Sequence, residues 1–255
     1  MTPETALSLI AIGIFGGAWN AVAGGATLFT FPALIAAGLP PVAANATNYL
    51  ALLPSNAAAL PAYRRELKSV GSAIWPLLAV SGVGAVVGSV LLLLSAEALF
   101  VALIPFLILL ATGLFAFGDS LRKFLLRVTD GQAVSHVLYL ALFVFSIYGG
   151  YFGAGLGIIL LAIVQIMGFA SFHVANSLKN LLATSFTVLS IAVFGAGGLI
   201  AWPEALLMMC GSTAGGYFGG RYARLVDERL LRVGVIVFGV VLAGVYFAEA
   251  AGAWQ

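Results

Sequence analysis

One basic residue of this sequence lies inside a long apolar stretch. Lys179 falls within segment 173–197, which is long enough to cross a membrane. A charged side chain at such a position costs about 3 kcal/mol on insertion scales and usually marks a functional site. An ammonium group there favours the binding of an anion. The alternative is structural, because Lys179 lies within two turns of the start of its segment and its flexible stem reaches the interface from there.

The segment around this lysine is the most polar of the apolar segments. Residues four apart share one face of a helix, so Asn176, Asn180 and Thr184 lie together. His173 and Ser177 fall beside this face. Amide and hydroxyl groups donate hydrogen bonds to anion oxygens, so Asn176, Ser177 and Asn180 are candidates for substrate binding. His173 is a candidate for proton coupling, or else a cap of the helix turn.

A second polar cluster lies in segment 41–62, at the place that corresponds to Lys179. Asn45, Thr47 and Asn48 interrupt an otherwise apolar run there. Their donor groups make them candidates for anion binding as well. The other interpretation is that they join helices, since hydrogen bonds between membrane helices contribute about 0.6 kcal/mol each on average. The presence of such a cluster in both segments favours a shared site.

Glycines interrupt two apolar segments that are too long for single helices. At 1.5 Å per residue, 34 residues would reach roughly 50 Å across a hydrocarbon core of about 30 Å. We therefore predict a full helix, a break and a short helix in each segment. A short helix that starts after a break presents unpaired N–H groups and the positive end of its dipole, which bind anions. The glycines are Gly24 and Gly25 in segment 5–38, and Gly155 and Gly157 in segment 134–168.

Two further residues precede the first break. Trp19 and Asn20 are candidates to line or gate a cavity. Neither a cation site nor a metal site is predicted, because no acidic residue lies inside an apolar segment and Cys210 is the only cysteine. No cofactor is expected, since the glycine-rich run at 153–157 lacks the strand and helix that flank a dinucleotide loop.

Composition places the chain in a membrane. Hydrophobic residues make up 62% of the sequence and charged residues 8%, whereas globular domains carry roughly 25% charged residues. A surface with so few charges needs lipid as its solvent, and the net charge of +2 gives no indication of nucleic-acid binding. An enzyme is not predicted, because the HExxH and GxSxG motifs are absent and the charged residues occupy short turns.

The basic residues predict the orientation of the chain. Apart from Lys179, all ten Lys and Arg residues fall within 64–68, 122–127 and 221–232. Such clusters lie on the cytoplasmic side, whereas the turn at 197–204 has none and is assigned to the outside. Both termini are then extracytoplasmic, in a bacterial cytoplasmic (inner) membrane. The N-terminus has no basic residue before its apolar run, so we interpret it as a membrane segment rather than a signal peptide.

Matching motifs indicate an internal duplication. The pattern Gly-xxx-Trp-Pro occurs at 71–76 and again at 198–203, with glycines at equivalent spacings afterwards. We predict an all-α polytopic membrane protein with two inverted repeats of about five membrane segments each and glycine-broken first helices. Transporters with such repeats place their site near the membrane midplane. The predicted units are a membrane repeat at 1–118, a cytoplasmic linker at 119–133 and a membrane repeat at 134–255.

These motifs together resemble the TauE/SafE family of membrane proteins. The resemblance covers nearly the whole chain and implies export of small sulfur-containing anions such as sulfite, sulfoacetate or related sulfonates. The motifs that carry it are GGAWNAVAGGATLFTFPALIAAGLPPVAANATNYLALLPSNAAAL near the start, YGGYFGAGLGIILLAIVQIMG after the linker, and GGLIAWPEALLMMCGSTAGGYFGGRYARLV with LLRVGVIVFGVVL towards the end.

The leading hypothesis is therefore a secondary transporter that exports a small sulfur-containing anion by alternating access. Its expected partners are that anion and the lipid bilayer, and a homo-oligomer is compatible with the sequence. One alternative is a transporter or channel for another small solute, such as a carboxylate or a metal ion. The other is an accessory membrane subunit that transports nothing, against which the paired polar clusters argue.

Overall fold

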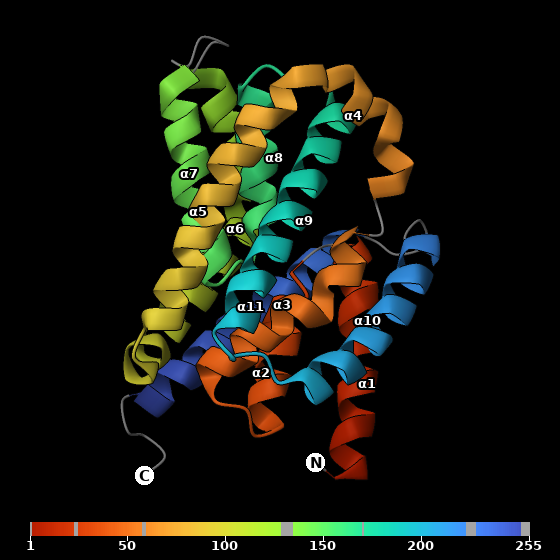
Figure 1. Cartoon of the computed structure of the whole chain (residues 1–255), viewed down its shortest axis with the longest axis vertical. Helices are drawn as coiled ribbons and strands as arrows, with labels where there is room; N and C mark the ends of the chain where they lie inside the picture. Colours follow the sequence, from red (N-terminus) through yellow and green to blue (C-terminus); the bar gives the residue numbers. More distant parts are fainter. Residues whose placement is uncertain are drawn as a thin grey trace.

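A computed structural model describes residues 2–22, 25–57, 60–128, 135–169, 171–222 and 228–250. Every regular element in these ranges is a helix, which confirms the all-α prediction (Figure 1). Two short 3-10 helices, η1 (Leu60–Tyr63) and η2 (Gly71–Ala73), flank α4. The α-helices are α1 (Pro3–Val22), α2 (Thr27–Ala36), α3 (Pro41–Ala57), α4 (Arg64–Val70), α5 (Ile74–Leu94), α6 (Glu97–Val128), α7 (Ser135–Tyr151), α8 (Leu156–Ile166), α9 (Phe172–Ala196), α10 (Trp202–Tyr222) and α11 (Glu228–Ala250).

Several helices have the length and composition of membrane spans. Within the described ranges, Arg64–Leu94, Glu97–Gly118 and His173–Ala196 are each long and apolar enough to cross a bilayer. Shorter apolar helices accompany them, and large apolar side chains such as Leu94 and Phe117 are more than two-thirds exposed. Outer faces of this kind require lipid. The chain is therefore a multi-pass membrane protein.

The predicted breaks are present in both long segments. α1 ends at Val22 and α2 begins at Thr27, and α7 and α8 are separated by a turn at 152–155. Gly25 and Gly155 adopt φ values of 80° and 74°, a conformation that favours glycine. A Cβ atom on Gly25 would also meet the ring of Phe115 at 2.5 Å. Gly24, the other predicted glycine of the first break, lies outside the described residues.

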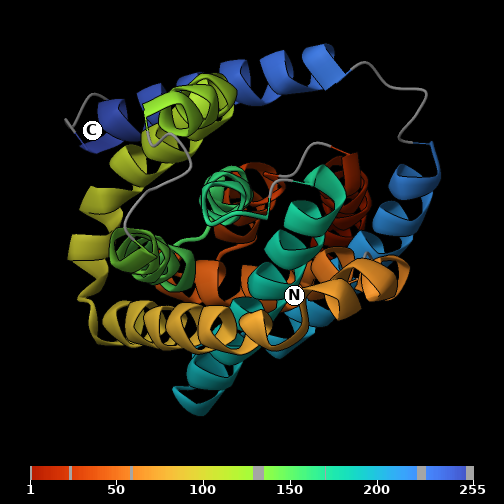
Figure 2. The same ribbon diagram turned by 90° about the horizontal axis from the view of Figure 1, so that it is seen from above.

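The short helices do not span the membrane by themselves. α2 has 10 residues and α8 has 11, which gives lengths of about 15 and 16 Å, half of a hydrocarbon core of about 30 Å. The chain turns back on itself at the second break, so α7 and α8 lie side by side in both views (Figures 1 and 2). α7 followed by the half-length α8 is the full helix and short helix that the sequence predicts for segment 134–168.

Two pairs of helices, each with one member from either half of the chain, pack closely through glycine residues. α1 lies against α10, and α5 lies against α7. A Cβ atom on Gly215 of α10 would overlap the carbonyl oxygen of Ile14, and one on Gly88 of α5 would overlap that of Ile147. In both pairs the helices run parallel, since the contacts advance in the same direction along both chains. Small residues allow this close approach of backbones.

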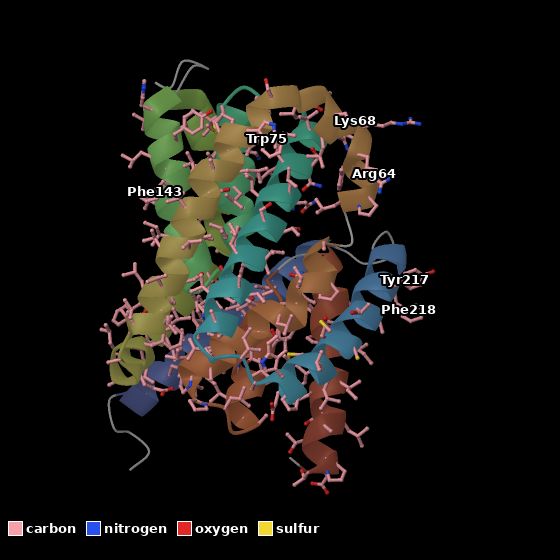
Figure 3. All side chains as sticks on the ribbon, in the orientation of Figure 1. Arg64, Lys68, Trp75, Phe143, Tyr217 and Phe218 are labelled. Carbon is pink, nitrogen blue, oxygen red and sulfur yellow. The ribbon has the colours of Figure 1, made fainter. Side chains whose placement is uncertain are left out.

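The charged ends of the helices mark the two sides of the molecule. Arg64 and Lys68 on α4 are exposed at the upper end of the molecule in Figure 3, whereas α1 begins at the lower end. Trp75, next to this basic cluster, is 71% exposed, as suits an aromatic residue at a membrane interface. α6 continues to Val128, within the segment predicted as a linker, and residues 129–134 are outside the described ranges.

Replacing Gly215 by alanine will destabilise the protein, because the added methyl group would overlap the Ile14 carbonyl. Overpacking of this kind costs about 1–3 kcal/mol. We expect the midpoint of thermal unfolding in detergent to fall by about 3–10 °C. Gly244→Ala is the control, since nothing lies within 4 Å of a Cβ atom at that position of α11. Equal midpoints for the two variants would contradict the close α1–α10 contact.

Candidate functional site

Lys179 lies beside the second helix break. Its Cδ atom is 3.7 Å from the position that a Cβ atom on Gly157 would occupy. Gly157 is the second residue of α8, and Gly155 is the N-cap of that helix. The lysine side chain therefore crosses the first turn of α8. It is partly buried and makes no hydrogen bond or ion pair with the described part of the chain.

The start of α8 carries a partial positive charge. The first amide groups of an α-helix have no partner within the helix, and its dipole is positive at this end. Two amides of this turn make only long hydrogen bonds, Leu156 to the Gly153 carbonyl at 3.4 Å and Ile158 to the Gly155 carbonyl at 3.3 Å. Amide donors next to an ammonium group can hold a small oxyanion.

The side chain of Asn48, in the first half of the chain, forms hydrogen bonds with other residues of the protein. Its Oδ1 accepts a hydrogen bond from the Thr30 hydroxyl at 2.6 Å, and its Nδ2 donates to the Thr27 hydroxyl at 3.3 Å. The side chain is 2% exposed. Asn48 thus joins α3 to the first turn of α2, as the structural interpretation of this residue predicts.

The other two residues of this cluster also bond to distant helices. Thr47 accepts a hydrogen bond from the backbone amide of Ala201 at 3.0 Å, just before α10. Asn45 donates from Nδ2 to the carbonyl oxygen of Tyr151 at 2.8 Å, at the end of α7. Both side chains are fully buried. The Oδ1 atom of Asn45 is buried and has no hydrogen-bond partner in the described part of the chain.

The polar residues of α9 differ in whether their side chains form hydrogen bonds with the described residues. Asn176 donates to the hydroxyl oxygen of Tyr63 at 2.8 Å, and Ser177 donates to the Val174 carbonyl at 2.7 Å. Asn180 is partly buried and forms no hydrogen bond with the residues that the structure describes. His173 is exposed in the first turn of the helix. Lys179 and Asn180 are therefore the two predicted binding groups of α9 that have no partner in the described part of the chain.

Trp19 and Asn20 lie close to the first break, as expected from their position. The Trp19 ring packs against Phe15 and Phe29, with centroids 5.3 and 5.0 Å apart, and its Nε1 atom is buried without a partner in the described ranges. Asn20 donates to the Ser55 hydroxyl at 2.9 Å, which ties α1 to α3. Asn20 thus has a structural bond, and the Trp19 indole does not.

Two tyrosines that the sequence analysis did not single out hold the second break together. The Tyr49 hydroxyl donates to the carbonyl oxygen of Gly149, and the Tyr148 hydroxyl donates to that of Ala154 at 2.7 Å. A buried tyrosine needs an acceptor for its hydroxyl. The position of Tyr148 next to a glycine pair was a signal for this role, whereas the partner of Tyr49 is a hundred residues away in sequence.

Comparison with known proteins identifies the family. The sequence pattern of the sulfite exporter TauE/SafE family matches residues 9–246. This chain belongs to that family. It is 31% identical to a probable membrane transporter protein of Haemophilus influenzae over 242 residues, covering 92% of this chain and 91% of the relative.

Other relatives carry the same description. Identity is 29% to the probable membrane transporter protein ORF9 of a Sinorhizobium species, covering 92% of this chain and 89% of that protein. It is 28% to the probable membrane transporter protein YfcA of Escherichia coli K12, covering 92% and 87%. No solved structure matches this TauE/SafE protein. The chain is thus a membrane transporter of the TauE/SafE family.

Among the described residues of this transporter, no group of three or more His, Cys, Asp or Glu side chains is placed to hold a metal ion. The predicted site residues without a hydrogen-bond partner in the described ranges are Lys179, Asn180 and Trp19, whose ammonium, amide and indole groups can all donate. Asn45 adds an unpaired buried acceptor, its Oδ1 atom, and the side chains of Glu66 and Ser146 also carry buried oxygens without a partner there.

Replacing a hydrogen-bonded asparagine will reduce the stability of the protein more than replacing one without a hydrogen-bond partner in the described chain. Asn48→Ala removes one buried and one partly buried hydrogen bond and leaves the Thr30 and Thr27 hydroxyls without this partner. We expect a loss of about 1–3 kcal/mol. Asn180→Ala, which removes no hydrogen bond to the described chain, is the matched control and should change stability by less than about 0.5 kcal/mol. Thermal unfolding in detergent measures both; a larger loss for the Asn180 variant would contradict this assignment.

Proposed function

We propose that this transporter exports a small sulfur-containing oxyanion, such as sulfite or an organosulfonate, from the bacterial cytoplasm by alternating access. The observation that carries the proposal is the unpaired Lys179 beside the N-terminal turn of α8. An interior with one cation and several donors favours an anion. The family description, which names sulfite export, supports sulfur oxyanions as the substrate class.

We further propose that residues 1–118 and 134–255 are inverted repeats joined by the linker 119–133. The packing supports this. The α1–α10 contact of Ile14 with Gly215 has a counterpart in the α7–α5 contact of Ile147 with Gly88. The parallel pair α1–α10 begins at one end of the molecule and the pair α5–α7 begins at the other (Figure 1). With the basic cluster of α4 in the cytoplasm, both termini are extracytoplasmic.

The two repeats differ at the start of their short helices, and this difference supports a single anion site in the second repeat. Thr27 in α2 and Gly157 in α8 each lie two residues after a glycine with positive φ. Asn48 bonds to Thr27, whereas Lys179 crosses Gly157. In the first repeat, internal hydrogen bonds occupy the helix start. In the second, the missing side chain leaves room for a ligand.

In this mechanism, the groups without a hydrogen-bond partner among the described residues bind the anion, and the hydrogen-bonded side chains hold the helices in place. Lys179 supplies the positive charge, α8 supplies backbone donors, and Asn180 adds an amide donor. The bond from Asn176 to Tyr63 joins α9 to η1 at the cytoplasmic side. It must open when the anion enters from the cytoplasm. Among the other predicted residues, Asn45, Thr47 and Asn48 join α3 to the end of α7, to the residue before α10 and to α2, whereas Ser177 bonds within α9.

Lys179→Ala will strongly reduce anion transport, because it removes the charge of the site. We expect the uptake of labelled sulfite or sulfoacetate into proteoliposomes to fall at least about tenfold, the equivalent of 1.4 kcal/mol of binding. Lys68→Ala is the control, since this lysine is exposed on α4 (Figure 3). Equal uptake by wild type and Lys179→Ala would remove Lys179 from the site.

Gly157→Ala will weaken anion binding without unfolding the protein. The added methyl group makes only an ordinary contact with Lys179, at 3.7 Å, but it covers the first turn of α8. We expect the KM for anion uptake to rise severalfold while the thermal midpoint stays equal or rises, since alanine favours the helix by up to about 1 kcal/mol.

The matched control for this variant is Gly195→Ala on α9, where a Cβ atom also meets its nearest neighbour, Ile200, at an ordinary 3.8 Å. Its KM should remain that of the wild type. If Gly157→Ala transports with an unchanged KM, the anion does not approach the start of α8.

A further inference from the structure

The Oδ1 atom of Asn45 is a buried acceptor without a hydrogen-bond partner among the described residues. Asn45 is 0% exposed, and its Nδ2 is committed to the Tyr151 carbonyl at 2.8 Å. This bond orients the amide, so that the oxygen is the atom without a partner. An unpaired buried acceptor is costly, and such an atom in a native structure calls for a ligand, an ion or a water molecule.

Asn45 lies at the negative end of a helix. The last carbonyls of α7 have no partners within the helix, and its dipole is negative there. α7 has no basic residue in its last turn to offset this charge. Side chains from other helices contact these oxygens instead: Tyr49 donates to Gly149, and Ser89 Oγ lies 3.3 Å from the Gly150 carbonyl.

Each of these carbonyl oxygens has a second lone pair. The end of α7 is therefore a cluster of oxygen acceptors whose donors are already used. An amide oxygen accepts hydrogen bonds and cannot donate one, so it repels an anion. Hard cations take oxygen ligands, and the half-helix C-termini of transporters coordinate Na⁺.

We propose that Asn45 Oδ1 and the C-terminal carbonyls of α7 bind a monovalent cation of the Na⁺ class, which is the coupling ion of transport. The neutral ligand set suits a monovalent ion, since no carboxylate compensates a second charge. The two helix ends at the α7–α8 break then bind ions of opposite charge. The C-terminus of α7 binds the cation, and the N-terminus of α8 binds the anion. A cation bound at one end strengthens anion binding at the other by simple attraction.

The binding part of this proposal stands apart from the proposed function, and the coupling part rests on it. Binding is measured first, without any anion substrate. Purified protein in detergent is heated in sodium gluconate or in choline gluconate at the same ionic strength. At a Na⁺ concentration about ten times Kd, we expect the midpoint of unfolding to rise by about 3–5 °C in wild type.

Asn45→Ala will lose this Na⁺-dependent shift. Ser146→Ala is the matched control, because Ser146 is also fully buried on α7 with an unpaired Oγ among the described residues, but it faces Gly84 of α5. It should keep the full shift. If Asn45→Ala proves too unstable to purify, Asn45→Asp retains an acceptor oxygen and should keep or increase the shift. The proposal is overturned if wild type shows no shift with Na⁺, as a water molecule at Oδ1 would predict, or if Asn45→Ala retains the shift.

Coupling is then measured as anion uptake into proteoliposomes under an imposed Na⁺ gradient, with choline as the replacement. We expect the gradient to stimulate uptake severalfold in wild type and in Ser146→Ala, and not in Asn45→Ala. A Na⁺ shift in a protein that moves no sulfur anion would retain the cation site and reject the proposed function. Anion uptake that is indifferent to Na⁺, with no thermal shift, would reject the cation site and retain the proposed function.

Discussion

A helix that breaks inside a membrane exposes backbone groups that lipid cannot satisfy. In this protein the chain breaks twice, between α1 and α2 and between α7 and α8. At the second break, Tyr49 and Asn45 of α3 donate hydrogen bonds to carbonyl oxygens at the end of α7, and Tyr148 of α7 itself donates to the Ala154 carbonyl in the turn. Most of the buried polar side chains of α3 serve this purpose or bridge to a neighbouring helix. The interior is polar because these side chains pair with the backbone groups that the helix breaks expose.

Close packing of the helices keeps the donors and acceptors of these hydrogen bonds in position. Glycines bring α1 against α10 and α5 against α7 until backbone touches backbone, so each half of the chain is held by helices of the other half. Contacts of this kind tolerate little deformation, because no flexible side chain lies between the two backbones.

The breaks also separate charge. A half-length helix has a positive start and a negative end within the membrane, where few other charges compete. At the start of α2, Asn48 donates to the Thr27 hydroxyl and the backbone amides of residues 28–30 bond to the Gly25 and Ala26 carbonyls. At the start of α8, the Leu156 and Ile158 amides make only long hydrogen bonds, and Lys179 lies over Gly157. The two breaks therefore differ in their local chemistry, although both begin a short helix after a glycine with positive φ.

The sequence by itself determined the helices, their breaks and the position of Lys179. These depend on local properties: runs of apolar residues, glycines with free backbone conformation, and a charge with no neighbour to offset it. Family membership was also visible in the order of motifs.

Only the tertiary structure decided which polar residues are structural. Asn45, Thr47 and Asn48 have the same appearance in the sequence as Asn180, and all were candidates for anion binding, with the joining of helices as the other interpretation of the first three. Asn45 and Thr47 bond to residues more than a hundred positions away, and such partners have no trace in local spacing. The tertiary structure likewise placed Lys179 on Gly157, because the packing of α8 against α9, not the sequence between them, brings the two together.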